Sequence, residues 1–107
     1  MLDPEKIFHE VSTAGEAWAN LKAAYELLDD VTKSVLADIT ANFMDGKMSR
    51  AEAEMRALAS GDYKTHLASV SAARKEWLRA QVKYDSLKLL ADLRRSQESS
   101  RRAEMQL

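Results

Sequence analysis

Residues 7–39 read IFHEVSTAGEAWANLKAAYELLDDVTKSVLADI and repeat apolar positions at alternating intervals of four and three residues. The two interleaved series are Ile7, Ala14, Leu21, Leu28 and Val35, and Val11, Trp18, Tyr25, Thr32 and Ile39. This spacing, kept over five heptads, predicts a helix with a coiled-coil seam. An isolated helix of this kind is only marginally stable in water, so another helix must cover the seam.

A second seam begins at Tyr63 and alternates large rings with small side chains. Its members are Tyr63, Val70, Trp77, Tyr84 and Ala91, interleaved with His66, Ala73, Ala80 and Leu87. Such alternation is typical of facing layers that interdigitate at core density, so we interpret these rings as core rather than as a ligand platform. The apolar pattern of this seam stops after Leu93.

Capping and breaking residues divide the chain into segments. Asp3 followed by Pro4 is typical of a helix start, and we expect one continuous first helix from about residue 4 to residue 44, running through Gly15. A turn is predicted at 45–49, where Gly46 would supply a left-handed conformation. A second helical arm then covers about residues 50–105.

Two details refine the second arm. Ser49 and Glu52 have the spacing of a capping box and predict its start. Gly61 predicts a kink or a short interruption at residues 60–62, where Asp62 could cap a new helix.

Composition agrees with an all-helical chain. Among 107 residues there are 3 Gly and 1 Pro, and 46% of the residues are hydrophobic. The predicted fold is all-α: a single domain, residues 1–107, in which two long helices form an elongated antiparallel helical hairpin that assembles into a homo-oligomer.

The argument for a homo-oligomer comes from an apolar stripe beside the second seam. One partner helix cannot cover both the seam and this stripe, and a second copy of the chain would remove the stripe from water. The expected interface residues are Leu78, Val82, Leu89, Leu90 and Leu93. The alternative is a monomer in which residues 50–60 fold back over the stripe.

Charge is distributed unevenly along the chain. Residues 1–60 hold 6 Lys and Arg against 11 Asp and Glu, whereas residues 61–107 hold 10 against 6. A row of long cationic side chains can match a phosphate backbone without reading its sequence. The candidate nucleic-acid-binding residues in such a row are Arg74, Lys75, Arg79, Lys83, Lys88, Arg94, Arg95, Arg101 and Arg102. The alternative is a solvated helix face whose basic side chains only shield the seam.

Other chemistry is not indicated. The chain has no cysteine, and neither His9 nor His66 has partners at a metal-ligand spacing, so we expect no catalytic residues, no metal and no cofactor. No leader and no apolar run near 18 residues is present, which predicts a cytoplasmic protein without membrane contact.

One resemblance covers roughly residues 25–98. The run Glu54–Asp62, the turn from Phe43 to Gly46 before it and the helix end Leu90–Ser96 resemble, in order and spacing, the UvsY family of phage recombination mediators. The resemblance implies a non-enzymatic helical protein in the host cytoplasm that forms a ring-like homo-oligomer through its C-terminal helix and binds single-stranded DNA. A recombinase and a single-strand-binding protein are the further partners that it implies. The resemblance also adds Lys64 to the candidate nucleic-acid-binding residues.

The sequence thus favours a recombination mediator that binds single-stranded DNA as an oligomer. A competing hypothesis is a helical adaptor or inhibitor whose apolar stripe docks a protein partner. A third is a structural coiled-coil component of a larger particle.

Overall fold

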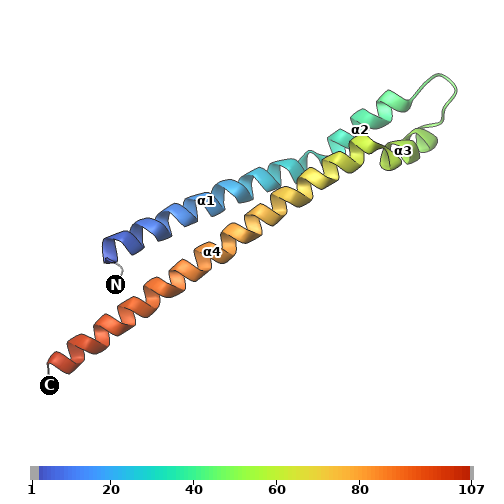
Figure 1. Cartoon of the computed structure of the whole chain (residues 1–107). Coiled ribbons are helices and arrows are strands. Elements are labelled where there is room, and N and C mark those ends of the chain that lie inside the picture. The colour runs from blue at the N-terminus through green and yellow to red at the C-terminus, as the bar shows by residue number, and fades with distance from the viewer. Residues whose placement is uncertain (1–2, 107) are drawn as a thin grey trace. The chain divides into compact units, whose positions relative to one another are not determined.

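The computed structural model describes residues 3–106, and this part of the chain is all-helical, without strands. Its helices are α1 (Pro4–Asp30), α2 (Thr32–Phe43), α3 (Arg50–Ala59) and α4 (Gly61–Met105), shown in Figure 1. The predicted all-α class is therefore confirmed. Contacts divide the described chain into a terminal unit, residues 3–21 and 77–106, and a central unit, residues 22–76.

In the terminal unit, the start of α1 packs antiparallel to the second half of α4. Ile7 and Ala14 are buried at this contact. Trp18 and Tyr84 bring their ring centroids to 5.9 Å. Tyr84 also explains the glycine within α1, because a Cβ atom at Gly15 would lie only 3.0 Å from the ring. Helix α1 runs through Gly15 without a break, as expected.

In the central unit, small residues let α2 and α3 approach closely. Ala53 and Ala57 of α3 are fully buried, and Ile39 and Thr40 of α2 are buried with them. The Thr40 hydroxyl is satisfied within its own helix, since it donates to the Leu36 carbonyl at 2.7 Å. The contact therefore buries little side-chain volume, and the other residues of α3 are exposed.

The expected continuous helix from residue 4 to residue 44 is instead two helices, separated at Val31. Val31 has ψ near 0°. The next residue, Thr32, donates its hydroxyl hydrogen to the Leu28 carbonyl at 3.3 Å and lies 2.9 Å from His66 Nε2. Hydroxyls that bond back to the preceding turn can bend helices, and here the bond accompanies the contact with His66.

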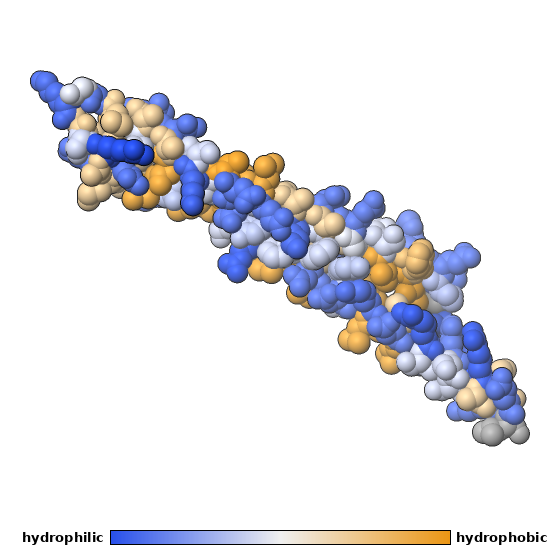
Figure 2. Space-filling model, turned by 180° about the vertical axis from the view of Figure 1, so that it is seen from behind, coloured by the Kyte–Doolittle hydropathy of each residue, from blue (hydrophilic) through white to orange (hydrophobic). Residues whose placement is uncertain are grey.

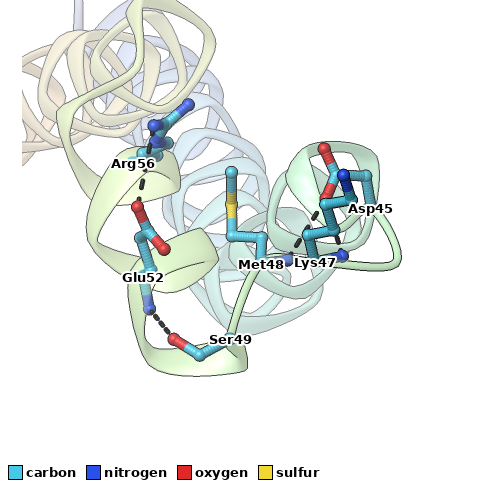
Figure 3. Close-up of polar contacts among 6 residues, drawn as sticks. All are labelled: Asp45, Lys47, Met48, Ser49, Glu52 and Arg56. Atoms are coloured by element: carbon cyan, nitrogen blue, oxygen red, sulfur yellow. Dashed lines mark hydrogen bonds and ion pairs between the residues drawn. The ribbon is translucent and has the colours of Figure 1, made fainter.

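The connection between α2 and α3 is held by side chains rather than by a left-handed glycine (Figure 3). The Asp45 carboxylate accepts from the amides of Lys47 at 3.0 Å and Met48 at 3.2 Å. The predicted left-handed Gly46 is wrong: all three glycines lie among the described residues and none has a positive φ. An aspartate that captures the amides two and three residues on builds the turn without it.

Serines begin the last two helices. Ser49 accepts from the Glu52 amide at 3.2 Å, while the Glu52 carboxylate turns to Arg56 at 3.7 Å, so only half of the predicted capping box forms. Within residues 60–62, the break lies at Ser60, which has an extended backbone. Its hydroxyl accepts from the Tyr63 amide at 3.2 Å, so Ser60 and not Asp62 caps α4.

Substitution at Gly15 tests the packing of Tyr84. Gly15→Val is expected to lower the free energy of unfolding by about 1–3 kcal/mol, because the added side chain must displace the ring. Urea unfolding followed by circular dichroism, at one fixed protein concentration, measures the change.

Gly46→Ala is the matched control, since no atom lies within 4 Å of a Cβ there. We expect its stability to stay within about 0.5 kcal/mol of the parent chain. Equal stability of Gly15→Val and the parent would contradict the close approach of Tyr84.

Candidate nucleic-acid interface and apolar face of α4

All ten basic residues that the sequence singled out lie on α4. Lys64, Arg74 and Lys75 belong to the central unit, and the other seven belong to the terminal unit. Nine of the ten are exposed and Arg94 is half-buried. The helix therefore offers cationic side chains to solvent in both units.

Carboxylates on α4 partly neutralise three of these cations. Lys88 Nζ lies 3.4 Å from Asp85, Arg94 Nε lies 3.9 Å from Glu98, and Arg95 pairs with Asp92. The pairs of Lys88 and Arg95 are exposed and contribute only about 0–1 kcal/mol each, so a phosphate could replace the carboxylate there at small cost. Six candidates have no ion-pair partner within residues 3–106: Lys64, Arg74, Lys75, Lys83, Arg101 and Arg102.

Lys88 is also held by an aromatic ring. Its ammonium nitrogen lies 4.4 Å from the centroid of the Tyr84 ring. That ring packs on Trp18 and Gly15 of α1, so Lys88 lies beside the contact between α1 and α4. A cation over an aromatic face gains about 0.5–1 kcal/mol at an exposed site.

The sequence predicts that the seam of α4 stops after Leu93, but in the structure the seam continues. Arg94 and Glu98 occupy the next two seam positions, and both are half-buried. Arg94 and Glu98 were not predicted in the seam, because the prediction followed apolar residues only. Arg94 is therefore a poorer candidate for nucleic-acid contact than Arg101 or Arg102.

A groove of about 500 Å³ lies beside this end of the seam. Its walls include Ile7, Phe8 and Val11 from α1, and its rim carries Lys88 and Arg95 from α4. Phe8 is 75% exposed. Sequence reasoning missed this residue because it lies outside the heptad series, one position after the buried Ile7.

The predicted apolar stripe is open to solvent in the single chain. Leu78, Val82, Leu89 and Leu93 are 42%, 67%, 70% and 54% exposed, and Leu90 beside them is 39% exposed. Orange, apolar side chains also reach the surface among hydrophilic ones on the face shown in Figure 2. Helix α3 packs on α2 within the central unit.

The stripe and the seam lie on opposite faces of α4. Seam residues such as Ala80, Tyr84 and Leu87 point to one side of the helix. At about 100° per residue, Val82 and Leu89 point to the other side. Even the seam side is only partly covered, since no described residue of α4 is buried.

Within residues 3–106, no group of three or more His, Asp or Glu side chains could hold a metal ion. His9 is exposed, and His66 contacts Thr32. No helix of this part of the chain is long and apolar enough to cross a membrane.

Comparisons with protein-family models, with curated proteins and with solved structures found no match to this chain. The exposed cations and the apolar stripe of α4 are therefore the basis for the function proposed next.

Proposed function

We propose that this protein is a non-enzymatic recombination mediator of the phage type, which assembles with copies of itself and binds single-stranded DNA. In this proposal the chain is an antiparallel hairpin of long helices, α4 supplies both the contact between copies and the cationic surface, and the setting is the host cytoplasm. The partners would include a recombinase and a single-strand-binding protein.

The observation that carries the proposal is the exposed apolar stripe on a helix that also carries ten cations. Fully burying one Leu or Val side chain contributes about 1.5–3 kcal/mol to stability, and this chain leaves four of them exposed to water. Self-association removes them from water. It also repeats the cationic side chains, and linked weak phosphate contacts then multiply.

A second candidate function follows from the same stripe. A helical adaptor or inhibitor would cover it with a partner protein's amphipathic helix, and the charges would set the orientation and rate of encounter. A structural coiled-coil component would also associate but would not bind DNA. Assembly and DNA affinity, measured together, separate the three.

Assembly is tested by adding a charge to the stripe. We expect Leu89→Glu to lower the mass measured by size-exclusion chromatography with light scattering to that of one chain, because a carboxylate buried in an interface is costly. Helix content by circular dichroism should be kept, since Leu89 is exposed in the single chain.

Thr65→Glu is the matched control, because Thr65 is an exposed residue of α4 outside the stripe. It should assemble as the parent does. A parent chain that runs as a single copy at all concentrations would rule out self-association and favour the adaptor.

DNA binding is tested by fluorescence anisotropy of a labelled single-stranded oligonucleotide over a salt series. Phosphate contacts predict that the logarithm of the affinity falls linearly with the logarithm of salt, by about 0.7 per phosphate neutralised. The double variant Arg101→Ala with Arg102→Ala should reduce that slope by up to about 1.4.

The double variant Lys33→Ala with Lys47→Ala removes the same charge away from α4 and should leave the slope unchanged. Absence of binding at low salt would refute the nucleic-acid part of the proposal.

A further inference from the structure

The exposed stripe of α4 has a spacing that is the same in both chain directions. Leu78, Val82, Leu89 and Leu93 are separated by four, seven and four residues. The midpoint falls between Asp85 and Ser86, and the stripe belongs entirely to the terminal unit. A helix read backwards from that midpoint presents the same pattern of apolar side chains.

We propose that α4 pairs antiparallel with α4 of a second copy, about a two-fold axis at this midpoint. This inference rests on the proposed self-association and specifies its geometry. In such an isologous contact Leu78 lies level with the partner's Leu93, and Val82 lies level with the partner's Leu89. All four exposed apolar side chains of each copy are then covered by apolar side chains of the other.

Charge along the stripe favours this direction over a parallel pair. Lys75 lies in line with the stripe, seven residues before Val82. In the antiparallel pair Lys75 lies level with the partner's Ser96. A parallel pair in register would place Lys75 level with the partner's Lys75 at the end of the contact, which is unfavourable.

The basic end of α4 adds a second argument. A parallel pair would bring together two sets of Arg94, Arg95, Arg101 and Arg102, of which Arg101 and Arg102 have no ion-pair partner within residues 3–106. The antiparallel pair moves these sets to opposite ends. With a rise of 1.5 Å per residue, the two Arg101–Arg102 pairs lie about 48 Å apart along the axis.

The flanks of the stripe are compatible with the antiparallel pair. Asp85 and Lys88 lie on one flank, and the two-fold axis brings that flank beside the same flank of the partner. Asp85 then lies one residue in level from the partner's Asp85 and two residues, about 3 Å along the axis, from the partner's Lys88. The Lys88 ammonium group, 3.4 Å from Asp85 in its own chain, offsets the two carboxylates that meet there.

Cysteine cross-linking tests the pairing, because the natural chain has no cysteine. Lys75→Cys and Ser96→Cys are prepared separately, since both positions are exposed. Mixed and oxidised under mild conditions, they should form the mixed disulfide, identified by its mass. Each variant alone should remain reduced, because two copies of Ser96 lie about 31 Å apart in this arrangement, far beyond disulfide reach.

Ser86→Cys is the positive control, because position 86 lies beside the two-fold axis and should cross-link alone. Homodisulfides of Ser96→Cys would overturn the antiparallel direction. Reduced chains that associate in light scattering but give no cross-link at any of the three positions would overturn this interface and leave self-association standing. Chains that do not associate at all would overturn both.

Discussion

In the terminal unit one segment of α1 covers one face of α4, and a single neighbouring helix cannot shield more than one face. The consequence is visible in the burial: Ile7 and Ala14 of α1 are buried, whereas no described residue of α4 is. Within residues 3–106 no large side chain is fully buried. The free energy of unfolding of such a chain is small unless something covers the remaining apolar surface.

The seams were the most predictable part of the fold. Every residue of both predicted seams is buried or half-buried, because shielding between paired helices follows the heptad directly. The breaks were less predictable. The interruption at Val31 accompanies a contact between Thr32 and His66, which are 34 residues apart, and local patterning does not contain that information. Near Gly46, the hydrogen bonds of Asp45 form the turn for which a left-handed glycine was predicted. At the start of α4, the cap is Ser60 and not Asp62 as predicted.

The candidate site shows the same division. That α4 carries the cations and an exposed apolar stripe could be read from residue types and spacing. The pair of Asp85 with Lys88 could also be read from their spacing, and the structure confirms it. The partners of Arg94 and Arg95 could not, because exposed side chains choose among several neighbours three and four residues away. The position of Lys88 over Tyr84 and the exposure of Phe8 depend on how α1 and α4 pack, so they required the structure.

The contact between Thr32 and His66 has a consequence for the alignment of the helices in the central unit. Heptad seams are periodic, so α2 could in principle slide along α4 by seven residues and still match apolar layers. A slide of that length would set Thr32 against Ala73 and His66 against Ile39. The Thr32 hydroxyl would keep its bond to the Leu28 carbonyl, but the His66 ring would lose its partner in an apolar layer. A polar group left without a partner when buried costs about 1–3 kcal/mol. The contact between Thr32 and His66 therefore fixes the register of the two helices among alignments that the apolar layers alone would not distinguish.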